Sequence, residues 1–190
     1  MNTVGLFFGS FNPIHNGHLL IASYLLEKGY CTKVWFIVSP QNPWKEDHSL
    51  LDEQQRLEIV RKAIGGDKRM EACDIEFTMP RPSYTYQTLQ ALKEKYPGEH
   101  FALIIGGDNL LRFHQWQNYR QILSEFPILV YPRLGIPVPD KTEPNITVVD
   151  APMSDLSSTL IRQKVAEGKD ISSDVPAGAV ELIIKTYRFN

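Results

Sequence analysis

Two histidines, three positions apart, follow the first apolar run of the chain. The segment GSFNPIHNGHL at positions 9–19 contains His15 and His18, and a helix is expected to begin near Asn16. The first N–H groups of a helix have no partner within it and, together with the helix dipole, attract anions. Both imidazoles lie on one face of the first turn, so they can address one phosphate group and stabilise charge that develops in phosphoryl transfer. The alternative is a pair of surface histidines that cap a helix.

A second set of donors lies far along the chain, in SSTLIR at positions 157–162. Ser157 is predicted to cap a helix, with Ser158 and Thr159 in the first turn. The guanidinium of Arg162 follows one turn later. Alone, this pattern is typical of an ordinary helix start with a solvated arginine. It contributes to a phosphate site only if this helix end meets the first one across a cleft.

Other common ways to bind a metal or a phosphate do not match the chain. Two histidines at this spacing can ligate zinc, but His48, His100 and His114 are scattered and no companion ligand motif occurs. The P-loop pattern GxxxxGK[ST] is absent from the sequence, and no GxGxxG follows a predicted strand. We therefore expect no metal held by the protein's own residues. A P-loop enzyme and a standard dinucleotide-dependent dehydrogenase are both disfavoured.

Short apolar runs alternate with helical patterns along the chain. Strands are predicted at 4–8, 34–38, 101–105, 128–131 and 146–149, and by the alternation of Cys73, Ile75 and Phe77. Helices are predicted from near Asn16 to Gly29, from a capping box of Ser49 and Asp52 to Ile64, at 85–96, at 119–126, and after Ser157 and Pro176. This order favours an α/β fold with a doubly wound, Rossmann-like parallel sheet. We expect one domain over residues 1–190, with a small helical C-terminal part over about 152–190.

Composition narrows the class of protein. The chain has 190 residues, 43% of them hydrophobic and 22% charged, with a formal net charge of −2, which favours a globular domain over a disordered chain. Nucleic-acid binders usually have a basic excess, so we expect no nucleic-acid partner. The N-terminus lacks signal-peptide features, no apolar run approaches the roughly 18 residues that span a bilayer, and the two cysteines lie far apart. These features predict a cytoplasmic protein without a membrane partner.

The two donor segments together resemble a known superfamily. GSFNPIHNGHL and SSTLIR are similar to the two signatures of the nucleotidyltransferases with an HxGH motif. Between them, RPSYTYQTL at 81–89, IIGGDNL at 104–110 and Trp116 resemble internal motifs of the bacterial-type nicotinate-nucleotide adenylyltransferases. The matches occur in order and extend from the first strand to VPAGAV at 175–180. The HxGH motif alone is moderately specific, whereas the ordered set is a strong signal.

The resemblance implies transfer of AMP from ATP to nicotinate mononucleotide, which gives nicotinate adenine dinucleotide and pyrophosphate in NAD biosynthesis. It implies direct attack on the α-phosphorus, so that catalysis depends on positioning and electrostatic stabilisation. Mg²⁺ would arrive with ATP, and the oligomeric state stays open. The implied catalytic residues are His15, His18 and Arg162. The implied ATP-binding residues are Gly9, Ser10, Phe11, Gly106, Asp108, Ser157, Ser158 and Thr159.

The resemblance also implies an acceptor site. Its residues would be Lys45, Tyr84, Thr85 and Trp116. The Trp116 indole would stack on the electron-poor pyridine ring, and N–H groups near Thr85 would bind the pyridine carboxylate. Amides that hold a carboxylate would favour nicotinate mononucleotide over its nicotinamide form. The alternatives are a Trp116 packed in the core or on a helix, and a Tyr84 that is an ordinary turn residue.

Three features depart from the family pattern, whose first motif commonly reads GGTFDPxHxGH. Ser10 replaces threonine and keeps the hydroxyl, whereas Asn12 replaces aspartate and removes a charge near the expected phosphates. After the second strand the common PHK reads Pro43-Trp44-Lys45, in which Lys45 can still reach a phosphate. The loop over 43–50 is a candidate lid.

Two alternatives to this function are kept. The first is an adenylyl- or cytidylyltransferase of the same superfamily with another phosphate acceptor, such as pantetheine phosphate. The second is a non-catalytic nucleotide-binding module that has kept the fold. The presence of both histidines, Lys45 and Arg162 argues against the second, because a sensor has no evident need for every transition-state contact. A screen of acceptors against ATP and CTP separates these hypotheses.

Overall fold

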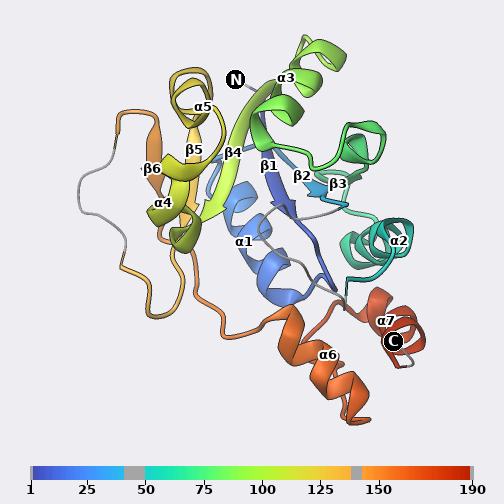
Figure 1. Cartoon of the computed structure of the whole chain (residues 1–190). Helices are drawn as coiled ribbons and strands as arrows, with labels where there is room; N and C mark the ends of the chain where they lie inside the picture. Colours follow the sequence, from blue (N-terminus) through green and yellow to red (C-terminus); the bar gives the residue numbers. More distant parts are fainter. Residues whose placement is uncertain (1, 41–49, 138–142, 189–190) are drawn as a thin grey trace.

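Six parallel strands form one sheet in the order β3-β2-β1-β4-β5-β6 (Figure 1). The structure, a computed structural model, describes residues 2–40, 50–137 and 143–188. The strands are β1 (Thr3–Gly9), β2 (Lys33–Val38), β3 (Met70–Cys73), β4 (His100–Gly106), β5 (Ile128–Tyr131) and β6 (Ile146–Val148). The strand order reverses between β1 and β4, which confirms the predicted doubly wound sheet. In such sheets ligands bind beyond the carboxyl ends of the strands at this reversal.

Helices and short 3₁₀ turns connect the strands. The helices are α1 (Asn16–Glu27), α2 (Glu53–Ile64), α3 (Thr85–Lys95), α4 (Gly107–Arg112), α5 (Tyr119–Glu125), α6 (Ser158–Ala166) and α7 (Val180–Tyr187). The 3₁₀ turns are η1 (Ile75–Thr78), η2 (Phe113–Gln115) and η3 (Ala177–Ala179). Within the described ranges, none of these helices combines the length and the apolar character that crossing a bilayer requires.

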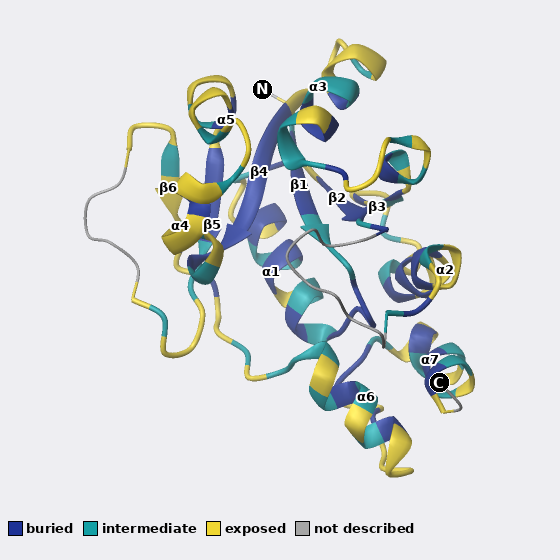
Figure 2. Cartoon of the chain, in the orientation of Figure 1, coloured by how far each residue is buried: buried dark blue, intermediate teal, exposed yellow. Residues whose placement is uncertain are grey.

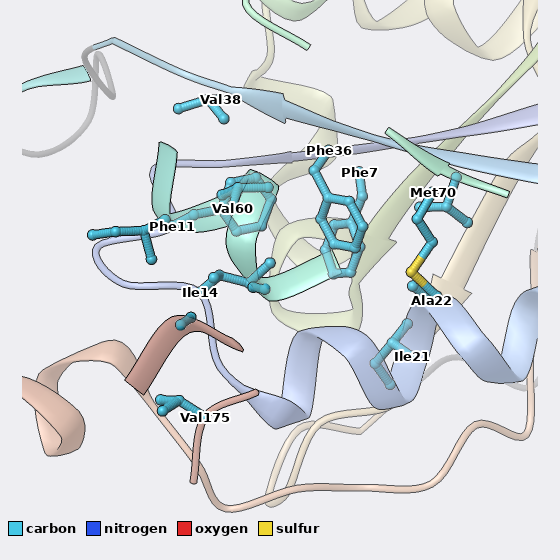
Figure 3. Close-up of a cluster of buried hydrophobic side chains, with 14 of the residues drawn as sticks. Phe7, Phe11, Ile14, Ile21, Ala22, Phe36, Val38, Val60, Met70 and Val175 are labelled. Atoms are coloured by element: carbon cyan, nitrogen blue, oxygen red, sulfur yellow. The ribbon is translucent and has the colours of Figure 1, made fainter. Parts of the chain in front are cut away.

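Both faces of the sheet are buried, because alternate residues of each central strand point to opposite sides. On one face Phe7 and Phe36 stack in a core that also contains residues of α1, α2, α6 and α7 (Figure 3). On the other face Leu6 and Trp35 pack with residues of α3 and α5. Figure 2 shows the central strands buried and the outer faces of the helices exposed. This burial on two sides makes the carboxyl ends of the strands a rigid edge for the loops that follow.

The C-terminal part of the chain contacts the start of α1 as well as the core. Helix α7 lies beside α2, and α6 leads down from the segment that follows β6 (Figure 1). The backbone N–H of Asn16 donates to the Asp174 carbonyl at 2.8 Å, and the Asn16 amide donates to the Ser173 carbonyl at 2.9 Å. The first turn of α1 is therefore held by residues more than 150 positions later in the chain.

Four differences separate the predicted elements from the structure. The strand predicted through Cys73, Ile75 and Phe77 is wrong beyond Cys73, because the chain turns there into η1. That turn buries the side chain of Glu76, which an extended strand would point away from Cys73 and Ile75. After Pro176 the 3₁₀ turn η3 comes first, and α7 begins only at Val180.

The other two differences concern helix starts. Asp52 caps α2, since its carboxylate accepts from the N–H groups of Gln54 and Gln55 at 2.9 and 3.3 Å. The prediction made Asp52 the partner of a capping Ser49, which lies outside the described residues. Helix α4 was not predicted, and it follows β4 with no intervening loop. Its glycine-rich start, GGD, reads as a turn in the sequence.

Candidate active site

The two histidine rings lie against each other at the start of α1, tilted by 34°. His15 is the residue that precedes the helix, and His18 lies in the first turn, with the ring centroids 3.8 Å apart. The backbone N–H of His15 donates to Nδ1 of His18 at 3.2 Å. Because Nδ1 accepts this bond, a neutral His18 carries its proton on Nε2. His18 therefore presents a fixed ring N–H donor.

Burial keeps both imidazoles neutral. His15 is 6% exposed, and burial followed by the charge of Arg133 lowers its pKa from 6.5 to about 4, against an opposing contribution from Asp174. Burial also holds the pKa of His18 well below 6.5, with further contributions from His15 and Arg133. The rings of Phe7 and Phe11 lie 5.8 and 5.2 Å from that of His18. At neutral pH both rings are therefore uncharged, and each can offer an N–H donor.

Gly17, between the two histidines, leaves room for their stacking. A Cβ at this position would lie 3.0 Å from atoms of the His15 ring and 3.0 Å from Oγ of Ser154. Such contacts are tighter than almost all real Cβ contacts, so a side chain would displace one of them. The small residue of the HxGH pattern is therefore a packing requirement of the His15 ring.

The second donor segment contacts the first one directly. The Ser158 hydroxyl donates to the carbonyl of Pro13 at 2.8 Å, and Nη1 of Arg162 donates to the carbonyl of Asn12 at 2.7 Å. Ser157 caps α6 by accepting from the N–H of Leu160 at 3.2 Å. The start of α6 is therefore joined to the loop before α1. What α6 offers to an anion is its backbone N–H groups, the exposed Thr159 and the guanidinium of Arg162.

A small pocket, open to solvent, lies beside the two histidines. It is lined by Phe7, His15, Gly17, His18, Ile21, Tyr131, Pro132, Arg133, Pro152, Ser154 and Leu156. The neutral imidazoles, the Arg133 guanidinium and the Ser154 hydroxyl give this pocket donors for a phosphorylated ligand. Burial raises the pKa of Tyr131, which lines the same wall, to about 12.

Asp108 lies two residues after the end of β4 and contacts Arg133, which lines this pocket. It lies in the first turn of α4, and its Oδ2 pairs with Nη1 of Arg133 at 3.2 Å. Its other oxygen, Oδ1, is buried and has no hydrogen-bond partner among the residues that the structure describes. A ligand hydroxyl could supply the missing donor. Within the described ranges, no group of three or more His, Cys, Asp or Glu side chains is arranged to hold a metal ion.

The start of another helix, α3, follows β3 and the η1 turn. Tyr84 precedes the helix and Thr85 begins it, and both are half-buried. The first N–H groups of α3 have no partner within the helix, so they can receive a carboxylate. Trp116 follows η2, is partly exposed, and packs on Phe113 with 5.4 Å between ring centroids. None of these residues lines the pocket beside α1, as far as the described residues define it.

Known proteins decide the family. The cytidylyltransferase-like family model matches residues 6–164. The probable nicotinate-nucleotide adenylyltransferase of Flavobacterium johnsoniae is 46% identical over 183 residues, which cover 95% of each chain. The corresponding protein of Bacteroides fragilis is 50% identical over 169 residues, 88% of this chain and 84% of the relative. The chain belongs to the nicotinate-nucleotide adenylyltransferase family.

The fold agrees with this family. The solved structure titled Plasmodium falciparum nicotinic acid mononucleotide adenylyltransferase complexed with NaAD superposes with a TM-score of 0.83. The match covers 100% of this chain and 99% of that one at 19% identity. The architecture is therefore shared across relatives whose sequences have diverged widely.

The structure brings most of the family's motif positions to one edge of the sheet. Five of them precede α1 or lie in its first turn, four lie at the start of α6, two lie where β4 joins α4, two lie at the start of α3 and one follows η2. In that order they are Gly9, Ser10, Phe11, His15 and His18; Ser157, Ser158, Thr159 and Arg162; Gly106 and Asp108; Tyr84 and Thr85; and Trp116. Lys45, Trp44 and the candidate lid up to residue 49 lie outside the described residues.

Asn12, the departure from the family's aspartate, is a buried connector. It is 2% exposed, and its Oδ1 accepts from the N–H of Leu51 at 3.2 Å and from the Tyr187 hydroxyl at 2.7 Å. The side chain thus faces α7 and the start of the α2 segment, while its carbonyl accepts from Arg162. The neutral amide joins three parts of the chain without placing a charge in the core.

Arg56 is a site-building residue that sequence reasoning missed. It is fully buried, and Nη1 donates to the carbonyls of Ser10 and Ser39 at 2.6 and 2.8 Å. Nε and Nη2 donate to the carbonyls of Leu51 and Pro40 at 2.7 and 3.0 Å. One guanidinium therefore fixes the loop after β1 and both flanks of the segment that contains Lys45. A signal was present, because Arg56 lies one helical turn before Val60 on the predicted apolar face of α2.

Proposed function

We propose that this protein transfers AMP from ATP to nicotinate mononucleotide and releases nicotinate adenine dinucleotide and pyrophosphate, a step of NAD biosynthesis. The observation that carries the proposal is the direct joining of the two signature segments through Ser158 to Pro13 and Arg162 to Asn12. Two helix starts that meet in this way present converging donors to a polyphosphate. Family membership supplies the acceptor, since the relatives are named for nicotinate nucleotide.

The residues that bind the phosphates of ATP are neutral hydrogen-bond donors and one guanidinium. In our proposal the acceptor phosphate attacks the α-phosphorus of ATP, the bond to the pyrophosphate oxygen breaks, and pyrophosphate leaves. The Nε2–H of His18 and the ring of His15 hydrogen-bond the α-phosphate oxygens as their charge grows. Arg162 and the N–H groups of Gly9, Ser10, Phe11, Ser157, Ser158 and Thr159 hold the remaining phosphates. No side chain of the site needs to form a covalent bond.

The nucleoside and acceptor ends use different parts of the edge. Asp108, at the glycine-rich start of α4 after Gly106, accepts from a ribose hydroxyl. The N–H groups at Thr85 bind the pyridine carboxylate beside Tyr84, the Trp116 indole stacks on the pyridine ring, and Lys45 pairs with the acceptor phosphate. Amide donors select the acid, so nicotinate mononucleotide is preferred over nicotinamide mononucleotide.

Mg²⁺ enters with ATP in this proposal. Asp108 pairs through one oxygen with Arg133, which lines the pocket, and the described residues form no cluster of metal ligands. The phosphate oxygens therefore provide the ligands, and the ion screens their charge. We expect the enzyme to act in the cytoplasm on these small molecules, without a nucleic-acid partner.

The test is acceptor-dependent release of pyrophosphate. The purified chain with ATP and Mg²⁺ is given nicotinate mononucleotide, nicotinamide mononucleotide, pantetheine phosphate or no acceptor, and each reaction is repeated with CTP. We expect turnover with ATP and nicotinate mononucleotide and much less with the other pairs. Turnover with pantetheine phosphate or CTP instead would identify another transferase of the superfamily. ATP binding without product from any pair would indicate a non-catalytic module.

A further inference from the structure

A buried carboxylate lies beneath the start of α3. Glu76, in the η1 turn, is 2% exposed. Its Oε2 accepts from the Ser83 hydroxyl at 2.9 Å and its Oε1 accepts from the Thr88 hydroxyl at 2.7 Å. The Ser39 side chain also hydrogen-bonds this carboxylate. Three hydroxyl groups, one after β2 and two at the start of α3, therefore converge on one buried acid.

The residues that carry these hydroxyls are neighbours of the residues expected to bind the acceptor. Ser39 follows β2 and its carbonyl is held by Arg56, at the flank of the segment that contains Lys45. Ser83 directly precedes Tyr84, and Thr88 lies in the first turn of α3, fully buried. The carboxylate thus accepts hydrogen bonds from residues on both sides of Thr85, namely Ser83 and Thr88.

Stability alone does not explain an acid at this place. A buried carboxylate loses its hydration, and burial accordingly raises the pKa of Glu76 while the hydroxyl bonds lower it. Buried ionic groups are often replaceable by well-packed apolar residues without loss of stability. A carboxylate has a use that an apolar side chain lacks, because its two oxygens fix several donors in defined directions.

We propose that Glu76 is a positioning residue for the acceptor: through Ser83 and Thr88 it orients the start of α3, whose N–H groups receive the pyridine carboxylate. The inference rests on the proposed function and deepens it, since it assigns the residue that makes the acceptor subsite rigid. Glu76 itself touches no substrate.

The variant Glu76→Gln keeps the shape and removes one acceptor oxygen. We expect the KM for nicotinate mononucleotide to rise about tenfold, the effect of weakening one charge-assisted hydrogen bond, with the KM for ATP changed less than about twofold. Thr88→Val, which is isosteric but lacks the hydroxyl, raises the same KM, and Thr88→Ser restores it. Melting temperatures are measured for all variants, so that kinetics are compared only among folded proteins.

Glu125→Gln is the matched control. Glu125 also accepts from three groups of α3, namely the Tyr86 hydroxyl, the Gln90 amide and the Lys93 ammonium, but it is exposed and α5 carries it. We expect this variant to leave both KM values unchanged. Equal changes in both KM values of Glu76→Gln, or no change in either, would overturn the inference, and so would a Thr88→Ser variant that behaves like Thr88→Val.

Hydrogen–deuterium exchange separates this inference from the proposed function. If the wild-type chain does not turn over nicotinate mononucleotide, the proposed function is wrong, yet exchange still reports on the start of α3. Glu76→Gln should speed exchange over 83–88 and leave α1 as in the wild type. Unchanged exchange over 83–88 would show that Glu76 does not hold this helix start.

Discussion

Two helix starts face the same edge of the sheet, and they are supported by different physical means. The start of α1 is packed among aromatic rings, and burial keeps His15 and His18 neutral. The start of α3 is held by the carboxylate of Glu76 through hydroxyl groups. Packing is spread over many atoms, whereas a hydrogen-bond network depends on a few. One edge of the sheet can therefore combine two kinds of support. Burial keeps the imidazoles of α1 uncharged, and hydrogen bonds hold the start of α3 in place.

The largest expected effect comes from His18→Asn at the start of α1. Asparagine can still accept from the His15 N–H, but it has no donor where Nε2–H lies. We expect kcat to fall about 100- to 1000-fold, the usual cost of one donor that acts on developing charge. His18→Gln, which brings an amide N–H toward that position, should recover part of the loss in the pyrophosphate assay.

The control for this comparison is His100→Asn, an exposed histidine at the opposite end of β4. It should keep wild-type kcat. A folded His18→Asn variant with near-normal kcat would show that the donors at α1 do not act on the transition state. The start of α1 would then have no catalytic role that distinguishes it from the start of α3.

The next effect concerns pH and stability. Folding lowers the pKa of His15 from 6.5 to about 4. Between pH 4 and pH 6.5, His15 is therefore protonated in the unfolded chain and neutral in the folded chain. The free energy of unfolding should therefore be highest above pH 6.5 and fall as the pH drops toward 4, by about 3 kcal/mol for this residue. In His15→Asn this part of the dependence should disappear. Urea unfolding at several pH values measures it, and an unchanged slope would contradict burial as the source of neutrality.

A smaller effect tests how tightly the α1 start is packed. In Gly17→Ala the new Cβ would meet the His15 ring and the Ser154 hydroxyl. We expect about 1–3 kcal/mol of lost stability and a clear fall in kcat, because overpacking shifts the ring. Gly66→Ala is the control, since a Cβ there meets nothing within 4 Å. Thermal unfolding and kinetics that are equal for the two variants would mean that the stacked geometry is not needed.

The smallest effect tests a polar contact on the α1 side. Tyr187→Phe removes the hydroxyl that donates to Asn12, while the N–H of Leu51 still donates to the same oxygen. Loss of one such bond costs about 1 kcal/mol. We expect a modest drop in melting temperature and kcat within about threefold of wild type. A loss of kcat as large as that of His18→Asn would mean that this end of the edge also depends on single hydrogen bonds.

The sequence predicted the parts of the fold that depend on local pattern. Central strands are buried on both faces, so runs such as those around Phe7 and Ile104 identify them without tertiary information. The placement of His15 and His18 on one side of a helix start follows from their spacing. The parallel sheet follows from the alternation of strands and helices, whereas the position of the reversal between β1 and β4 does not.

The residues that were missed act through contacts between distant positions. Glu76 lies in a run whose alternation predicts a strand, and nothing local shows that its carboxylate faces Ser39, Ser83 and Thr88. The role of Asn12 depends on Tyr187, 175 positions away. Arg56 alone left a local signal, a charge on an apolar helix face. Polar groups in the core are the least predictable part of such a site, because their partners are chosen by the fold.

The contact between Asn12 and Tyr187 also has a consequence for synthesis of the chain. The loop that begins the site is made early, but a donor to its buried amide, together with the segment that holds Asn16, is made last among the described residues. A ribosome-bound chain can therefore form the first strands before the loop between β1 and α1 is held in place. The loop between β1 and α1 therefore gains the last of its described contacts only when α7 has been made and has packed.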